Sequence, residues 1–164
     1  MHSFEVIGGK KLHGEIIPQG AKNEALQIIS AVLLTPDKVT ISNIPDIIDV
    51  NLLIELLGEM NVKLERTSRD TCTFQADDVN IDYLHSEAYK KKSGKLRGSV
   101  MLAGPMLARF KKAFIPKPGG DKIGRRRLDT HIIGLKNSVH RLHIMKKMGS
   151  FISKHPTCRG QICY

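Results

Sequence analysis

The sequence is poor in the residues that mark several protein classes. Among its 164 residues it has no tryptophan, three tyrosines and five phenylalanines. Three cysteines are too few for a disulfide framework, so we expect a reducing, cytoplasmic compartment. The apolar runs, such as residues 31–34, are far shorter than the roughly 20 residues of a membrane span. Residues 1–9 contain Glu5 and lack the apolar core of a signal peptide, so the sequence favours a protein of the cytoplasm.

Acidic residues are missing from the last part of the chain. All 16 aspartates and glutamates lie at or before Asp129, although the whole chain has a formal charge of +10. The segment after Asp129 also holds His155, Cys158 and Cys163, which could suggest a metal site. Their irregular spacing is unlike that of closed tetrahedral zinc sites, so we expect no metal there.

Local patterns predict alternating strands and helices. The expected strands are 4–6, 11–17, 39–42, 62–66, 71–76 and 113–115, with 62–66 and 71–76 forming a hairpin. The expected helices are 24–34, 47–60, a helix capped by Ser93 that runs to about Arg109, and 129–136. The broad apolar face of helix 47–60, which includes Ile48, Leu53 and Leu57, indicates deep burial. This order of elements favours an α/β domain with helices packed on a sheet.

Two segments share one pattern and form a weak internal repeat. Residues 22–39 and 97–113 both read as a helix, a polar turn and a strand, about 75 residues apart. Lys22 and Arg97 therefore stand at corresponding helix starts, where backbone amides and the helix dipole favour anions. Asn23 fits either an N-cap or an anion site. The pattern leaves open whether Lys22 is a ligand or an ordinary surface lysine.

The densest candidate site is the loop of residues 118–131. Gly119 and Gly120 allow backbone amides to approach a ligand closely. Arginines 125–127 supply forked donors that match phosphate or carboxylate oxygens. The pattern is typical of an anion site, and a solvated basic turn is the alternative that composition leaves open.

Four segments together carry a resemblance to a known family. They are residues 20–26 (GAKNEAL), 96–99 (LRGS), 104–110 (GPMLARF) and 118–131 (PGGDKIGRRRLDTH). In this order and spacing, from Val6 to about Asn137, the chain resembles the UDP-N-acetylglucosamine enolpyruvyl transferases, also called 1-carboxyvinyltransferases.

The resemblance implies a fold that is α/β, or more loosely α+β. It is a two-domain inside-out α/β barrel of βαβαββ repeats, incomplete here because chains of the family are more than twice as long. Residues 1–21 would be strands of a first, discontinuous domain. Residues 22–137 would be a partial second domain of about two repeats, and 138–164 a tail of different composition.

The resemblance also implies an activity. The family transfers the enolpyruvyl group of phosphoenolpyruvate to the 3-hydroxyl of UDP-N-acetylglucosamine, the first committed step of bacterial peptidoglycan synthesis, which takes place in the cytoplasm. No metal, no organic cofactor and no obligate protein partner is implied. We expect this chain by itself to be an inactive, truncated form.

The resemblance also implies roles for those residues of this chain that match the family's motifs. Lys22 and Arg126 would hold phosphoenolpyruvate, and Asp121 would be the catalytic proton donor. Asn23 and Arg97 would line the shared substrate site. The nucleotide sugar would be bordered by Arg127, Leu128, Asp129, Thr130 and His131.

Two positions depart from the family's pattern. The family commonly has cysteine where this chain has Asp121, and usually proline where it has Arg127. The usual cysteine is the target of the epoxide antibiotic fosfomycin, so the departure at Asp121 implies a fosfomycin-insensitive enzyme. The departure at Arg127 weakens its assignment as a sugar-nucleotide contact.

We hypothesise that residues 138–164 are a frameshift product. Synonymous codons can be chosen for this segment so that another reading frame continues the family's pattern of strand, glycine turn and strand. The underlying DNA sequence decides this hypothesis.

A basic nucleic-acid-binding module is the alternative function. Its motivation is the net charge and the clusters at residues 90–92, 111–112 and 125–127. The scarcity of aromatic residues argues against it, because few side chains could stack on bases.

Overall fold

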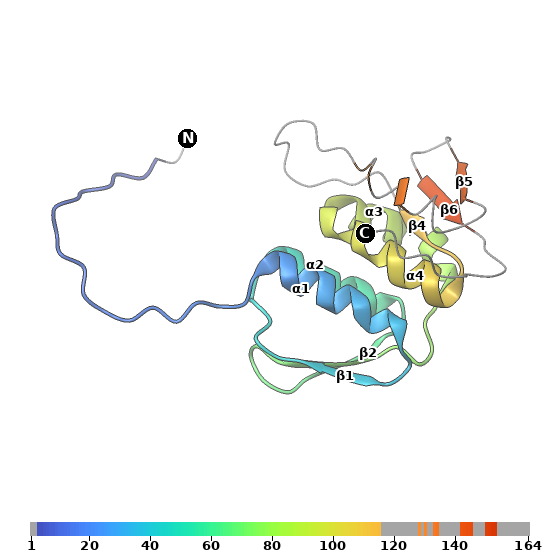
Figure 1. Cartoon of the computed structure of the whole chain (residues 1–164), viewed down its shortest axis with the longest axis horizontal. Coiled ribbons are helices and arrows are strands. Elements are labelled where there is room, and N and C mark those ends of the chain that lie inside the picture. Colours follow the sequence, from blue (N-terminus) through green and yellow to red (C-terminus); the bar gives the residue numbers. More distant parts are fainter. Residues whose placement is uncertain are drawn as a thin grey trace.

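A three-stranded antiparallel sheet lies at one side of the molecule (Figure 1). The computed structural model describes residues 3–115, 128, 130, 133–134, 142–145 and 150–153. The sheet consists of β1 (Lys38–Ile41), β2 (Lys63–Arg66) and β3 (Cys72–Gln75), in the order β1-β3-β2. Lys63 pairs with Gln75 and Arg66 with Cys72, which confirms the predicted hairpin. This part of the chain is therefore a mixed α+β structure with an antiparallel sheet.

Two helices cover one face of this sheet (Figure 1). Helix α1 (Lys22–Ala31) runs into the 3-10 helix η1 (Val32–Leu34), and α2 is Ile48–Glu59, so both predicted helices are confirmed. Phe74 of β3 is fully buried. The prediction that Ile48 is buried is wrong, since 83% of it is exposed. At 100° per residue, Ile48 lies on the opposite side of α2 from the buried residues Leu53 and Leu57.

A second helical layer packs on α1 and α2 (Figure 1). It consists of the 3-10 helix η2 (Asp82–His85), α3 (Glu87–Lys95), the 3-10 helix η3 (Arg97–Leu102) and α4 (Ala103–Phe110). The predicted single helix from Ser93 to Arg109 is wrong. The cap is Ser86, whose hydroxyl accepts a hydrogen bond from the Tyr89 amide, while Ser93 is buried inside α3. Pro105 lacks an amide hydrogen and fits only the first turn of a helix, so a new helix begins just before it.

The two repeat units pack against each other. The first unit is α1, η1 and β1, and the second is η3, α4 and a short strand, β4 (Phe114–Ile115). Helix α1 contacts η3, and η1 contacts α4. A Cβ at Gly98 would lie 2.9 Å from Cδ1 of Leu26, so only glycine allows this approach without a shift of Leu26. The repeat is confirmed as helix followed by strand, although the order of 3-10 and α-helix differs between the units.

Apolar side chains from the sheet, from α1 and α2, and from the second helical layer form one continuous core. Leu53, Leu56, Leu57 and Phe74 are all fully buried in it. Tyr89 is also buried, and its hydroxyl donates a hydrogen bond to the Phe114 carbonyl at 3.2 Å. Burial raises the pKa of Tyr89, so it remains a hydrogen-bond donor at neutral pH.

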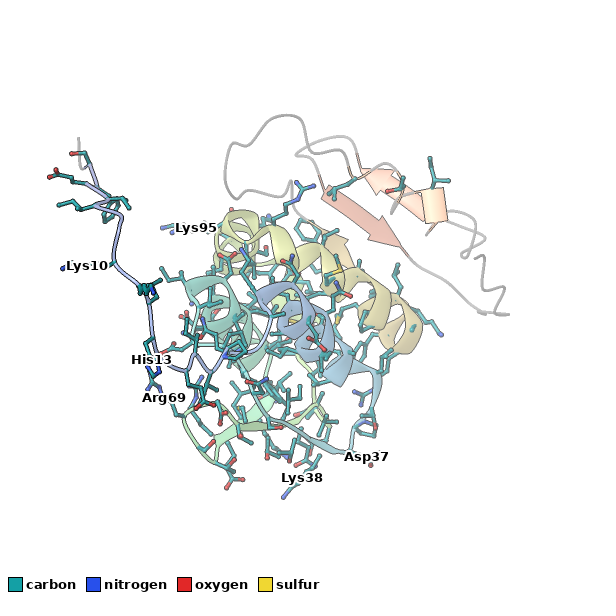
Figure 2. The ribbon with its side chains drawn as sticks, turned by 60° about the vertical axis from the view of Figure 1, so that its left-hand side comes forward. Lys10, His13, Asp37, Lys38, Arg69 and Lys95 are labelled. Atoms are coloured by element: carbon teal, nitrogen blue, oxygen red, sulfur yellow. The ribbon has the colours of Figure 1, made fainter. Side chains whose placement is uncertain are left out.

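The N-terminal segment extends away from the packed body as an arm, residues 3–20 (Figure 1). Figure 2 shows Lys10 and His13 on this arm. The two strands predicted within it are wrong for this chain, because the structure assigns no regular element to residues 3–21. A strand needs a partner for its backbone groups, and the arm's large apolar side chains are 82–98% exposed. The assignment of residues 1–21 to a separate first domain stays a prediction.

A second small sheet connects β4 with the tail. Strands β5 (Leu142–Met145) and β6 (Ser150–Ser153) are antiparallel, and β6 also pairs with β4, which gives the order β4-β6-β5. The predicted strand at 113–115 is confirmed by β4. Of the predicted helix 129–136, residues 130, 133 and 134 are helical and the remainder lies outside the described residues. Part of the tail therefore forms strands, which the sequence patterns did not predict.

Arg109 joins three parts of the backbone, and we expect its replacement to destabilise the fold. Its Nη1 lies 3.2, 3.1 and 2.6 Å from the carbonyl oxygens of Leu33, Thr35 and Ala76. Hydrogen bonds to a charged group contribute about 1.5–3 kcal/mol. Arg109→Met should therefore lower the free energy of unfolding by about 2–3 kcal/mol, measured by urea denaturation followed by circular dichroism.

Arg66→Met is the matched control for Arg109. Arg66 is exposed on β2, and its Nη1 donates to the single carbonyl of Arg69 at 3.1 Å. Its replacement should change the stability by less than about 0.5 kcal/mol. Equal urea midpoints for the two variants would show that the Arg109 contacts contribute no more than an exposed one.

Candidate anion site at paired helix starts

The start of α1 is defined by a close backbone contact. A Cβ at Gly20 would lie 2.0 Å from the carbonyl oxygen of Asn43, so only glycine fits where the chain passes this loop. Ala21 then takes an extended conformation as the N-cap, and no side chain caps the helix. Asn23 is the second residue of α1 and is exposed, so its alternative role as N-cap is wrong. Its role as a ligand residue stays a prediction.

Lys22 is the first residue of α1, and its ammonium group is held by an ion pair. Its Nζ lies 3.0 Å from Oδ2 of Asp49, the second residue of α2. Helices α1 and α2 pack together, and the pair joins their N-terminal ends. The side chains of Lys22 and Asp49 are 44% and 43% exposed. The ion pair therefore orients the ammonium group towards α2, and the group is still accessible to an anion from solution.

Sequence reasoning missed Asp49. The available signal was an acidic residue in the first turn of a helix, and this is a general preference set by the helix dipole. Such a preference indicates no partner 27 positions away in the chain. Only the packing of α1 on α2 shows that the partner is Lys22.

Arg97 lies beside the first turns of α1. It is the first residue of η3, as Lys22 is the first of α1. Its neighbour Gly98 approaches Leu26, which is one helical turn from Lys22. The structure therefore brings the starts of the two repeat units close together, as an anion site shared by both units requires.

The remaining predicted site residues belong to the loop after β4. Leu128 is partly buried against the hydrophobic core, and Thr130 is exposed. Leu128 therefore packs against protein. The other five predicted residues of this loop lie outside the described residues: Asp121, Arg126, Arg127, Asp129 and His131.

A small cavity lies beside the start of α1. It has a volume of about 100 Å³ and is lined by residues of the α1 start and of the loop after β1, including Gly20, Glu24 and Asn43. Small-molecule sites commonly have volumes of about 300–1,000 Å³. This cavity by itself is therefore smaller than a typical small-molecule site.

The lysine cluster at residues 90–92 is largely neutralised. Lys92 forms ion pairs with Glu55 and Glu59 of α2, and Glu59 lies 2.6 Å away. Lys90 pairs with Glu87. The hydrogen bond from Lys92 lowers the pKa of Glu59, and the two glutamates raise the pKa of Lys92. The two ion pairs of Lys92 join α2 to α3. With Lys90 and Lys92 both paired, the cluster offers little of the positive surface that a nucleic-acid-binding module needs.

Comparison with known proteins establishes the family. The model of the EPSP synthase (3-phosphoshikimate 1-carboxyvinyltransferase) family matches residues 6–148. The chain belongs to this family. The match continues beyond Asn137, where we expected the resemblance to end, and so includes the first part of the tail.

Individual members of the family show a closer similarity. The chain is 62% identical over 136 residues to the UDP-N-acetylglucosamine 1-carboxyvinyltransferase of Porphyromonas gingivalis, which covers 83% of this chain and 31% of the relative. It is 61% identical over 137 residues to the enzyme of the same name from Bacteroides thetaiotaomicron, with 84% and 32% covered. The chain therefore spans about a third of the length of these relatives and resembles their N-terminal portion.

A solved enolpyruvyl transferase shares the fold. The structure of NikO from Streptomyces tendae aligns with a TM-score of 0.67 at 18% sequence identity, covering 90% of this chain and 31% of that one.

Among the described residues of the present chain, no helix is long and apolar enough to cross a membrane.

Proposed function

We propose that this member of the EPSP synthase family is part of an enzyme that transfers enolpyruvyl from phosphoenolpyruvate to the 3-hydroxyl of UDP-N-acetylglucosamine, with release of phosphate. The observation that carries the proposal is the 61–62% identity to relatives named UDP-N-acetylglucosamine 1-carboxyvinyltransferase. The reaction would serve peptidoglycan synthesis in the bacterial cytoplasm. Because the chain spans about a third of those relatives, we expect no turnover from these 164 residues alone.

The residue types suit this reaction. Phosphoenolpyruvate brings a phosphate and a carboxylate together, so fixed cations neutralise its charge and orient the reacting carbon. In the proposal Lys22 and Arg126 supply these cations, and Asn23 and Arg97 line the space between phosphoenolpyruvate and the sugar. Asp121 donates a proton to the methylene carbon. No step requires a metal or an organic cofactor.

The nucleotide sugar would bind along the loop after β4. In the proposal residues 127–131 border it, through arginine, aspartate, threonine and histidine groups that can bond the diphosphate, the sugar and the base. Leu128 contributes by anchoring this segment, which agrees with its packing against the core.

A chimaera provides the direct test. Residues 1–137 of this chain would replace the matching segment of the Porphyromonas gingivalis relative, and phosphate release would be measured with both substrates. We expect turnover within about tenfold of the parent enzyme, since 62% identity over this segment preserves the packing.

The nucleic-acid alternative is tested on the same protein. A random oligonucleotide is titrated at two salt concentrations, with UDP-N-acetylglucosamine as the comparison ligand. Inactivity of the folded chimaera would refute the proposed function, and tight, strongly salt-dependent oligonucleotide binding would then favour the alternative.

A further inference from the structure

We propose that Asp49 is a positioning residue that aims the Lys22 ammonium at the anionic substrate. The inference rests on the proposed function and adds to it a residue that no motif indicated. It is carried by the geometry of the two helix starts, where Asp49 Oδ2 lies 3.0 Å from Lys22 Nζ.

A lysine at a helix start needs such a partner. The helix dipole places partial positive charge at the N-terminus of α1, so an ammonium there is disfavoured and tends to swing into solvent. Asp49 occupies the first turn of α2, where the same effect favours a carboxylate. The packing of α1 on α2 fixes Asp49 in place, and the ion pair then restricts the long lysine side chain to one direction.

The ion pair leaves capacity for a substrate. An ammonium group has three hydrogen-bond donors, and the contact with Asp49 uses one of them. Because 44% of the Lys22 side chain is exposed, the other two donors can reach a phosphate or carboxylate oxygen. Asp49 thus acts through Lys22 and does not itself contact the anion.

The negative charge of Asp49 has an opposing effect. A carboxylate close to an incoming anion repels it, and this repulsion alone would weaken binding. Asp49 is also 43% exposed, so solvent screens the repulsion. Misplacement of a reacting or binding group is more costly, since about 1 Å can reduce a rate about 100-fold. We therefore infer that positioning outweighs repulsion.

Two substitutions separate these effects in the chimaera. Asp49→Asn removes the charge and keeps an oxygen that can accept the Lys22 hydrogen bond, whereas Asp49→Ala removes both. We expect Asp49→Ala to raise the KM for phosphoenolpyruvate about tenfold, and Asp49→Asn to raise it less than about threefold. The KM for UDP-N-acetylglucosamine should stay unchanged, and the melting temperature should fall only slightly, because Asp49→Ala loses an exposed ion pair and a favourable charge in the first turn of α2.

Asp77→Ala is the matched control. Asp77 also pairs with a lysine, Lys63, at 2.5 Å, but this pair lies beside the sheet and outside the proposed site. Its replacement should leave both KM values unchanged.

Each outcome decides one point. A chimaera with Asp49 intact that is folded by circular dichroism but inactive overturns the proposed function and the inference with it. The positioning role alone is overturned if the chimaera is active and Asp49→Ala has a KM for phosphoenolpyruvate equal to or lower than that of the chimaera with Asp49. An equal rise of both KM values would show that Asp49 is merely structural.

Discussion

Lys22→Met in the chimaera is expected to lower kcat/KM for phosphoenolpyruvate by about 100- to 1,000-fold, the usual effect of removing one charge-stabilising donor. Methionine keeps most of the aliphatic stem and removes the ammonium. The only described contact of the Lys22 head group is the exposed pair with Asp49, so the fold should survive. The measurement is steady-state phosphate release, with circular dichroism to check the fold.

Lys63→Met gives the control for this prediction. Lys63 also forms an exposed ion pair with an aspartate, Asp77, and its side chain is 63% exposed. Loss of this pair should change stability by less than about 1 kcal/mol and leave turnover unchanged. Near-native turnover of Lys22→Met would show that Lys22 is an ordinary surface residue.

Asp121→Cys is expected to make the chimaera sensitive to fosfomycin, whereas the chimaera with Asp121 should be insensitive. A carboxylate is a much weaker nucleophile toward an epoxide than a thiolate. Asp121→Asn should abolish turnover, because an amide cannot donate the proton that the methylene carbon needs. Asp121→Cys should keep activity, since a thiol can also act as the proton donor. The measurement is residual activity after incubation with the drug.

The cysteine already present in residues 1–137 is not expected to respond. Cys72 is buried in β3, and its desolvation raises the pKa of the thiol, so little reactive thiolate forms. Asp70→Cys, in the exposed turn before β3, is the control for a new but misplaced thiol.

Two outcomes would contradict the prediction for Asp121. Fosfomycin inhibition of the chimaera with Asp121 intact would place the drug's target at another residue. Full activity of Asp121→Asn would remove Asp121 from the mechanism.

Elements with a strong local pattern were predictable. The helical spacing of apolar residues gave α1 and α2 within three residues of their observed ends, and the alternation around the turn at residues 68–70 gave the β2–β3 hairpin. Both signals act between residues that are near in sequence, so they need no knowledge of the remaining fold.

Elements that depend on distant packing were not predictable. The helical path breaks at Leu96, which is extended (φ −104°, ψ 110°) and buried in the core, and η3 then packs on α1. The pattern of apolar residues alone did not show this break. The exposure of Ile48 follows from which side of α2 meets the sheet and the second layer. The three carbonyl contacts of Arg109 join backbone segments that only the tertiary fold brings together.

The sequence by itself determined the family, the repeat and the placing of Lys22 and Arg97 at helix starts, because these depend on residue order and local spacing. The tertiary structure decided the antiparallel order β1-β3-β2, the exposed arm and the pairing of Lys22 with Asp49. The reason is physical. Backbone pairing between distant strands and ion pairs between different helices contribute free energy only after folding has brought those segments together. Local sequence patterns do not indicate which distant segments will meet.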